Sequence, residues 1–192
     1  MQKIIFIDRD GVINKDPGGR TRHNYVTKWE EFAFIDGSIE ALKKLKEADY
    51  KIFLISNQGG ISKGYFTKED LDRLNRRVLA EIEKRGGGID ELYYCHHHDE
   101  DNCECRKPKT GLIEQAIRNR DVDLANTFII GDSLRDVAAG KRMGMKAILV
   151  LSGKTELSKT KEWEIKPDCV KKDLLDAVKW VLERENKSHG GK

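Results

Sequence analysis

Short apolar runs alternate along this chain with longer segments in which apolar residues recur every three or four positions. The short runs predict buried strands, and the amphipathic segments predict helices. We expect strands at residues 3–7, 51–55, 91–94, 127–130 and 147–151, and helices at 38–48, 67–84, 110–119, 134–143 and 172–185. Strands that alternate with helices form a parallel sheet covered on both faces. The pattern therefore predicts a three-layer α/β fold with a parallel sheet of about five strands.

The spacing of these elements leaves little room for a second domain. Residues 11–38 are a short connection, and residues 56–106 hold only a helix, a strand and a cysteine-rich loop. We therefore expect one domain over residues 1–186 with a minimal cap, followed by a frayed tail over 187–192. Irregular loops are expected at 15–28, 96–109 and 152–166.

Composition narrows the class of protein. The 192 residues include 36 Lys and Arg against 33 Asp and Glu, so the net charge of +3 argues against nucleic acid or an anionic membrane as the main partner. The chain contains no apolar run of the roughly 18 residues that a membrane helix needs, and acidic residues closely follow its first apolar run. We expect a cytoplasmic protein, and a monomer, because no exposed apolar stripe stands out.

Polar side chains follow three of the predicted strands at the point where each strand ends. Asp8 and Asp10 follow the first strand, Ser56 and Asn57 follow the second, and Asp132 follows the fourth, with Asp136 one helical turn later. Such residues are common in turns and caps, which explains any one of these ends alone. The carboxyl ends of parallel strands meet at one edge of the sheet, however, and ligands bind there. We therefore expect these groups to converge.

Converging carboxylates repel one another, and a hard divalent cation removes the conflict. Mg²⁺ prefers one or two carboxylates together with water and phosphate oxygens. Ser56 and the glycine-rich turn after it offer a hydroxyl group and free N–H groups that suit phosphate, and Arg106 and Lys107 add positive charge. These groups predict phosphoryl transfer through an aspartyl-phosphate.

Three of the four cysteines lie within eleven residues, beside a run of histidines. Cys95 precedes His96, His97 and His98, and Cys103 and Cys105 follow closely. In a cytosolic protein such clustering favours a metal site over disulfides. Four thiolate and imidazole ligands would form a closed, structural Zn²⁺ site. A surface loop with free thiols is the alternative.

Four motifs, in chain order, are similar to those of the haloacid dehalogenase (HAD) superfamily of phosphatases. They are Asp8-Arg9-Asp10-Gly11-Val12, Ile55-Ser56-Asn57, Arg106-Lys107-Pro108 and Gly131-Asp132-Ser133-Leu134-Arg135-Asp136. The resemblance spans residues 3 to about 150 and implies a Rossmann-like HAD core.

The resemblance also implies roles for individual residues. Asp8 would be the nucleophile, and Asp10 would protonate the leaving oxygen and then activate water. Ser56 and Lys107 would hold the transferring phosphoryl group. The implied Mg²⁺ ligands are Asp8, the carbonyl group of Asp10, Asp132 and, as a further carboxylate, Asp136.

One subfamily of these phosphatases carries a zinc loop, which here corresponds to residues 95–105. By this resemblance the Zn²⁺ ligands are Cys95, His97, Cys103 and Cys105, with His96 or His98 as possible substitutes. The subfamily includes phosphatases for D-glycero-D-manno-heptose 1,7-bisphosphate, on the route to ADP-heptose and lipopolysaccharide, and for histidinol phosphate. The first activity releases heptose 1-phosphate.

The basic residues favour a sugar bisphosphate, because its second phosphate needs an anion-binding patch away from Mg²⁺. Candidate substrate-binding residues are Arg106, Lys63, Arg20 and Arg22, together with Asn57. The segment 17–24 is a candidate lining of the substrate entrance. Histidinol phosphate is the alternative substrate, because its amine could pair with the acids at 99–101 of the short zinc loop.

A phospho-acceptor signalling domain is the alternative of a different class. In such domains the phosphorylated aspartate stands alone on a middle strand, whereas no lone aspartate follows residues 51–55 here. Asp10, two residues from Asp8, is also placed to speed hydrolysis.

Overall fold

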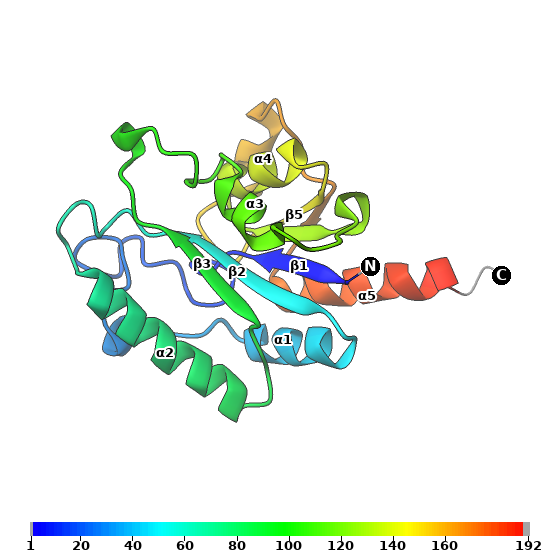
Figure 1. Cartoon of the computed structure of the whole chain (residues 1–192), viewed down its shortest axis with the longest axis horizontal. Helices are drawn as coiled ribbons and strands as arrows, with labels where there is room; N and C mark the ends of the chain where they lie inside the picture. The colour runs from blue at the N-terminus through cyan, green and yellow to red at the C-terminus, as the bar shows by residue number, and fades with distance from the viewer. Residues whose placement is uncertain (1, 190–192) are drawn as a thin grey trace.

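A single parallel sheet forms the centre of the molecule (Figure 1). The structure is a computed structural model and describes residues 2–189. The six strands lie in the order β3-β2-β1-β4-β5-β6, and every neighbouring pair is parallel. Their bounds are β1 Ile4–Ile7, β2 Lys51–Asn57, β3 Glu91–Cys95, β4 Phe128–Gly131, β5 Lys146–Val150 and β6 Cys169–Lys171. This order places β1 and β4 side by side in the middle of the sheet.

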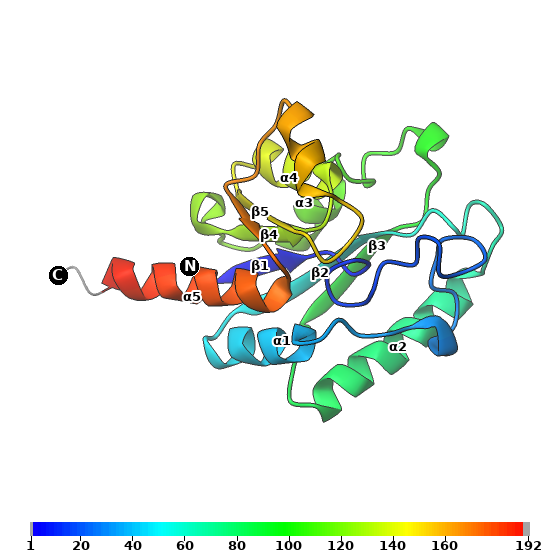
Figure 2. The same ribbon diagram turned by 180° about the vertical axis from the view of Figure 1, so that it is seen from behind.

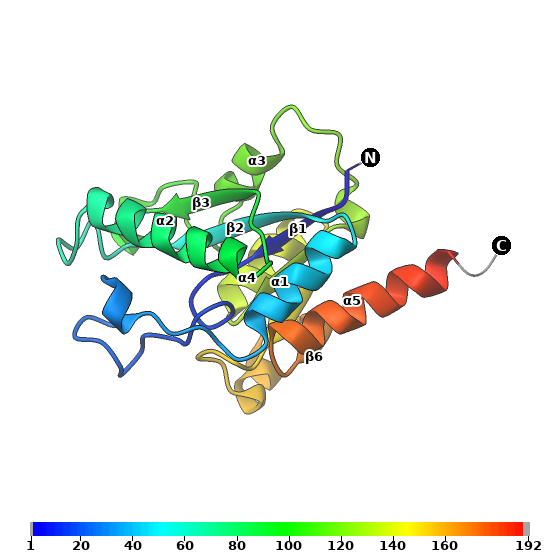
Figure 3. The same ribbon diagram turned by 90° about the horizontal axis from the view of Figure 1, so that it is seen from below.

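Helices cover both faces of the sheet, which gives three layers (Figure 3). On one face lie α1 Ser38–Glu47, α2 Lys68–Lys84 and α5 Leu174–His189; on the other lie α3 Gly111–Ile117 and α4 Leu134–Arg142. Successive residues of a strand point to opposite faces. In β1, Ile5 and Ile7 accordingly belong to the core under the first face, whereas Ile4 and Phe6 belong to the second core. The predicted α/β fold with a parallel sheet is confirmed.

Two features differ from the prediction. The sheet has six strands rather than about five, because β6 is only three half-buried residues long and shows no apolar run. The last helix continues to His189, so its end was predicted too early, and residues 187–189 are helical rather than a frayed tail. Neither glycine nor proline occurs between Leu174 and His189, so no strong helix breaker ends the helix at 186. Residues 190–192 lie outside the described part of the chain.

The long connections leave the carboxyl ends of the strands and gather at one edge of the sheet (Figure 2). Residues 8–37 follow β1 and include the short 3-10 helix η1 Trp29–Glu31; residues 96–110 follow β3 and include η2 Asp99–Asp101. Residues 151–168 follow β5 and include η4 Leu157–Glu162, and a further 3-10 turn, η3 Leu124–Asn126, precedes β4. Among residues 2–189, no helix has the length and apolar character needed to cross a membrane.

Candidate active site

Lys107 lies at the centre of the polar groups that converge at this edge. Its buried ammonium group donates to Asp136 Oδ1 at 2.6 Å and to the carbonyl oxygen of Ile55 at 2.9 Å, and lies 3.0 Å from Asp8 Oδ1. A lysine ammonium group has three donors, so these contacts use all of them. Lys107 therefore connects the ends of β1 and β2 to the first turn of α4.

Burial sets the ionisation of the carboxyl groups around Lys107. Loss of water raises the pKa of Asp8 to about 6, because the positive charge of Lys107 offsets it only in part and Asp136 adds repulsion. The same cause raises the pKa of Asp132 to about 7, with further repulsion from Asp136 and Asp8. Burial opposes the charge on Lys107, but its two carboxylate partners outweigh this effect and raise its pKa. Three carboxyl groups thus surround a single ammonium group, which offsets the repulsion between them only in part.

A second network holds Asp10 beside Asp8. The guanidinium group of Arg9, which is 1% exposed, donates to both carboxylate oxygens of Asp10, with the shortest contact at 3.0 Å. Asn14 donates to Asp10 Oδ1 at 2.9 Å, and the Gln58 amide donates to Asp10 Oδ2 at 2.8 Å. Burial opposes ionisation of Asp10, but Arg9 and these amides outweigh it and lower the pKa of this carboxyl group.

The amide of Gln58 also connects Asp10 to Ser56. The same nitrogen donates to Ser56 Oγ at 2.8 Å, and both Ser56 and Gln58 are buried. Ser56 is the penultimate residue of β2, so its hydroxyl group lies at the edge of the sheet where Asp8 follows β1. The structure therefore brings Asp8, Asp10, Ser56 and Lys107 together, as the sequence predicts.

Asp132 follows β4 and is fully buried against the backbone of two glycines. A Cβ atom at Gly11 would lie 2.5 Å from Asp132 Oδ2, and one at Gly153 would lie 2.1 Å from it. Gly11 also has φ of +82°, which favours glycine. The backbone N–H of Lys154 donates to Asp132 Oδ2 at 2.9 Å. Both glycines are thus required for the chain to pack around this carboxylate.

The carboxylates fit a hard cation. Asp8, Asp132 and Asp136 each offer an oxygen, and these oxygens all lie within 4.8 Å of one another. Asp132 Oδ1 is buried and has no hydrogen-bond partner, which a bound cation would satisfy. Both carboxylate oxygens of Asp136 already accept hydrogen bonds, Oδ1 from Lys107 and Oδ2 from Ser133 Oγ at 2.6 Å. Asp8 and Asp132 are therefore the better-placed ligands.

The cysteine-rich loop forms a second compact group of ligands. Donor atoms of Cys95, His97, Cys103 and Cys105 lie within 4.8 Å of one another, with Sγ–Sγ distances of 3.1–3.6 Å and 3.2 Å between His97 Nδ1 and Cys105 Sγ. The edges of a tetrahedron around Zn²⁺ with bonds of about 2.3 Å are about 3.7 Å long, so the arrangement fits such an ion. His96 stacks on His97, and His98 accepts a hydrogen bond from the Glu100 N–H, so neither belongs to this group.

The residues after Cys105 connect this loop to the carboxylates. Asn57, at the end of β2, accepts from the backbone N–H of Lys107 at 3.0 Å and donates to its carbonyl oxygen at 2.9 Å. The side chain of Arg106 is 11% exposed and pairs with Asp99 of the same loop. Asn57, predicted to bind substrate, thus holds the backbone of Lys107.

A cavity of about 310 Å³ opens above Asp8. Its lining consists of Asp8, Asp10, Asp16, Pro17, Gly18, Asn24, Tyr25, Ser56, Asn57, Arg135 and Lys154. The segment 17–24 therefore contributes to the wall. None of the four cations that the sequence offered for substrate binding lines it. Arg106 pairs with Asp99, and Arg20, Arg22 and Lys63 are exposed, with Arg20 bordering a neighbouring cavity.

Sequence reasoning missed several residues of the site. Arg135 stands in the fourth motif but had no role there, although it lies three residues after Asp132 in the first turn of α4. Asn75 accepts a hydrogen bond of 3.2 Å from buried Arg9. One signal would have identified Asn75: it lies on the apolar face of α2, among Leu71, Leu74 and Val78. Nothing in the sequence marked Asn14.

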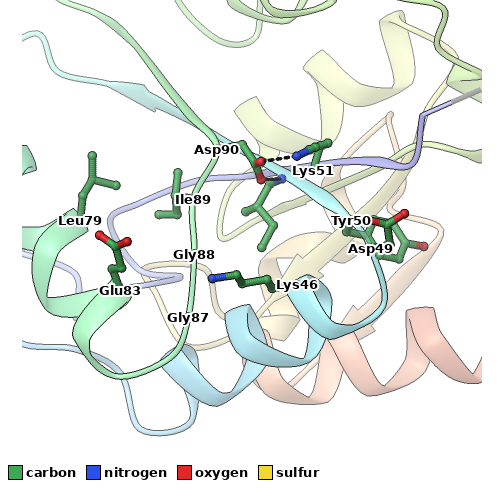
Figure 4. A pocket seen from close by; sticks show the side chains of 11 residues that line it. Lys46, Asp49, Tyr50, Lys51, Leu79, Glu83, Gly87, Gly88, Ile89 and Asp90 are labelled. Carbon is green, nitrogen blue, oxygen red and sulfur yellow. Dashed lines mark hydrogen bonds and ion pairs between the residues drawn. The ribbon is translucent and has the colours of Figure 1, made fainter.

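A cavity of about 600 Å³ lies at the opposite end of the sheet, where β2 begins (Figure 4). Lys46, Glu83 and Gly88 are among its lining residues. The Asp90 carboxylate in its wall already accepts from Lys51 at 2.9 Å and from the Ile52 N–H at 2.9 Å. No group of potential metal ligands in the described residues lies there, in contrast to the edge that carries Asp8.

The chain is similar to known proteins in sequence and in structure. The HAD-hydrolase-like family model matches residues 104–177, which include Lys107, Asp132 and Asp136. A D-glycero-beta-D-manno-heptose-1,7-bisphosphate 7-phosphatase of Pasteurella multocida is 42% identical over 161 residues, covering 80% of this chain and 84% of the relative. The protein of the same name from Haemophilus ducreyi is 37% identical over 188 residues, covering 94% and 98%.

A solved structure extends the likeness to the whole fold. The D,D-heptose 1,7-bisphosphate phosphatase of B. bronchiseptica, crystallised with magnesium and phosphate, matches with a TM-score of 0.85 and 32% identity, over 95% of this chain and 99% of that one. The fold, the four motifs and these relatives show that this chain belongs to the HAD-like hydrolase family. Both of these curated relatives and this solved structure bear the name of heptose-bisphosphate phosphatases.

Proposed function

We propose that this protein is a Mg²⁺-dependent phosphatase that removes the 7-phosphate of D-glycero-D-manno-heptose 1,7-bisphosphate and leaves heptose 1-phosphate. One observation carries the chemistry: Asp8 lies 3.0 Å from the Lys107 ammonium group, in a cavity that Asp10 and Ser56 also line. The names of the relatives, which are 35–42% identical in the best matches, support the substrate.

The proposed reaction has two steps. A carboxylate oxygen of Asp8 forms a bond to phosphorus while the bond from phosphorus to the sugar oxygen breaks, and that oxygen takes a proton from Asp10. Water then attacks the aspartyl-phosphate and gives a proton to Asp10, which releases phosphate and restores Asp8. Ser56 and Lys107 hold the phosphoryl oxygens, and the Gln58 amide keeps Asp10 and Ser56 in place.

The metal ions have different proposed roles. Mg²⁺, held by Asp8, Asp132 and the carbonyl group of Asp10, would neutralise charge on the phosphoryl group. The unpartnered Oδ1 of Asp132 supports this position. Zn²⁺ on Cys95, His97, Cys103 and Cys105 is structural, since four protein ligands leave no open position.

The surroundings of Asp99 favour a bisphosphate over histidinol phosphate. Asp99 pairs with Arg106, and its other oxygen lies 3.8 Å from Arg135. The hydrogen bond from Arg106 lowers the pKa of Asp99. This carboxylate is therefore engaged with two cations and is poorly placed to receive the amine of histidinol phosphate. Arg135 and Lys154, which line the cavity, instead offer positive charge to a second phosphate.

A panel of substrates tests this function. We expect kcat/KM for heptose 1,7-bisphosphate, with Mg²⁺ and zinc-loaded protein, to exceed that for fructose 1,6-bisphosphate and histidinol phosphate by more than about tenfold. Both anomers of the heptose substrate should be measured, with the cleaved position identified from the product. Preference for histidinol phosphate would replace the proposed substrate, and a stable phosphoprotein without turnover would favour a phospho-acceptor signalling domain.

A further inference from the structure

The segment that leaves β5 contacts the loops after β1 and β4 at the edge of the sheet. The strand order puts β1, β4 and β5 side by side, so the segment 152–154 lies next to both of these loops. The Ser152 hydroxyl group donates to the carbonyl oxygen of Gly11 at 2.7 Å. The backbone N–H of Lys154 donates to Asp132 Oδ2 at 2.9 Å. Three consecutive residues therefore hold two loops that lie far apart in the sequence.

Gly153 fills the narrow space between these two hydrogen bonds. A Cβ atom on Gly153 would lie 2.1 Å from Asp132 Oδ2, and one on Gly11 would lie 2.9 Å from the Cα atom of Gly153. The two glycine backbones therefore lie against each other and against the carboxylate. In such close packing, a shift of one group moves its neighbours.

The hydrogen bond from Lys154 also determines which oxygen of Asp132 is available. Oδ2 accepts from the Lys154 N–H, whereas the buried Oδ1 has no hydrogen-bond partner among the described residues. Because a carboxylate group is rigid and planar, a bond that holds Oδ2 also fixes where Oδ1 points. The segment 152–154 therefore keeps the oxygen that a cation would satisfy in a fixed place.

Gly11 needs a constraint from outside, because a glycine has little steric restriction of its own. It has φ of +82° and directly follows Asp10, whose carbonyl group is a proposed Mg²⁺ ligand. Its N–H donates to the Asn14 carbonyl oxygen at 2.7 Å, and its own carbonyl oxygen accepts from Ser152. The half-buried Ser152 does not line the cavity at Asp8, so its hydroxyl group acts through Gly11.

We infer that the segment 152–154 sets the affinity of the site for Mg²⁺, with Ser152 as a positioning residue that holds the loop after β1 against Asp132. The inference rests on the proposed function, in which the Asp10 carbonyl group and Asp132 hold Mg²⁺. It gives the Ser152 hydroxyl group a role that requires no contact with substrate or metal.

Mg²⁺ binding, measured by calorimetry without substrate, tests this role independently of turnover. Ser152→Ala removes the hydrogen bond to Gly11 and should weaken Mg²⁺ binding about fivefold, the size of one neutral hydrogen bond. Ser152→Thr keeps the hydroxyl group and should bind Mg²⁺ within about twofold of the unaltered protein. Ser158→Ala, at an exposed position in η4 of the same connection, is the matched control and should leave binding unchanged.

Gly153→Ala tests the contact with Asp132. The added Cβ atom would overlap Asp132 Oδ2, so we expect Mg²⁺ binding to weaken by more than about tenfold. Thermal unfolding without Mg²⁺ shows whether each variant is folded. If Gly153→Ala does not fold, the comparison of Ser152→Ala with Ser152→Thr decides the question alone.

Kinetics provide the second arm. Ser152→Ala should raise the Mg²⁺ concentration for half-maximal activity about fivefold, while kcat at saturating Mg²⁺ changes less than about twofold. A purely structural role would instead lower the melting temperature without metal and leave the Mg²⁺ affinity of the folded protein unchanged.

Equal Mg²⁺ affinity of Ser152→Ala and the unaltered protein would overturn the inference and leave the proposed function intact. Absence of Mg²⁺ binding to the unaltered protein would overturn both. If Ser152→Ala weakens Mg²⁺ binding but the unaltered protein hydrolyses no sugar phosphate, the proposed function fails and the role of Ser152 at the metal site stands.

Discussion

At the scale of single residues, two buried cations organise the site. Lys107 uses its three donors on Asp8, Asp136 and the Ile55 carbonyl oxygen, and Arg9 holds both oxygens of Asp10. Each cation has an acceptor on a helix, Asp136 on α4 for Lys107 and Asn75 on α2 for Arg9. The positions of Asp8 and Asp10 therefore depend on helices as well as on the loop after β1.

Replacing Asn75 tests this dependence for Asp10. Asn75→Leu removes the acceptor of Arg9 Nη1 and leaves a buried donor without a partner, which should destabilise the fold by about 1–3 kcal/mol. Because Arg9 then shifts, kcat should fall more than KM changes. Urea unfolding and steady-state kinetics measure the two effects. Arg73→Leu, on the exposed face of the same helix, should change neither; a variant at Asn75 with normal kcat would contradict the positioning role.

The side chains at the ends of the strands could be predicted from the sequence, whereas their hydrogen-bonding and ion-pair partners could not. Asp8 and Asp132 follow β1 and β4, and Ser56 is at the end of β2, so a topological rule that needs only the strands brings them together. The burial of Arg9 was not predictable, because an arginine in a loop is usually exposed and its partner Asn75 lies 66 residues away. The pairing of Asp136 with Lys107 likewise depends on how α4, which packs against β4 and β5, meets the loop that precedes α3.

At the scale of elements, the loop 95–105 is expected to control the cations that follow it. Cys105 is joined to Arg106 and Lys107, and Asn57 fixes the Lys107 backbone from β2. The loop contains only one short 3-10 helix, Asp99–Asp101, so a metal ion is the natural source of its order.

Removing one ligand of this loop tests that role. Cys103→Ser should lose zinc, measured by elemental analysis, and lose activity on the order of a hundredfold, because small displacements of phosphate-binding groups have effects of that size. Cys169→Ser, in β6 and outside the cluster, is the control and should retain both. Full activity of Cys103→Ser without bound zinc would show that the loop does not position Lys107.

The stability of the protein should depend on pH through Asp168, which lies at the edge of the sheet. Asp168 precedes β6 and accepts from the Ala147 N–H of β5 and from Lys141 of α4. Burial opposes its ionisation, but Lys141 and the N–H group outweigh it and lower its pKa below the ordinary 3.8. A lowered pKa in the folded state stabilises the protein above pH 3.8, and this stabilisation is lost as the pH falls through the folded-state pKa.

Asp168→Asn should therefore reduce the free energy of unfolding by about 1 kcal/mol at pH 7, and this difference should shrink below pH 4. Denaturant unfolding at several pH values measures it. Asp49→Asn, at an exposed turn, provides the baseline. A difference that stays constant from pH 7 to pH 3 would show that the ionised carboxylate is not the stabilising group.

For the molecule as a whole, the sequence predicted the class of fold correctly but missed the strand at one edge of the sheet. Five strands are apolar runs that any buried parallel strand requires, and the alternation with helices implies the layers. The strand β6 pairs only with β5 at the edge of the sheet, so it needs little burial and leaves no pattern. The contacts of segment 152–154 with Gly11 and Asp132 depend on the strand order β1-β4-β5, and nothing local in the segment predicts them.

In the proposed reaction, Asp8 becomes phosphorylated and Asp10 promotes the release of that phosphate. The most direct measurement mixes Asp10→Asn protein with heptose 1,7-bisphosphate and Mg²⁺, quenches with acid and maps the phosphorylated peptide by mass spectrometry. We expect phosphate on Asp8 that persists far longer than in the unmodified protein, and none in the Asp8→Asn, Asp10→Asn double variant. Phosphate on another residue, or heptose 1-phosphate formed by the double variant, would contradict it.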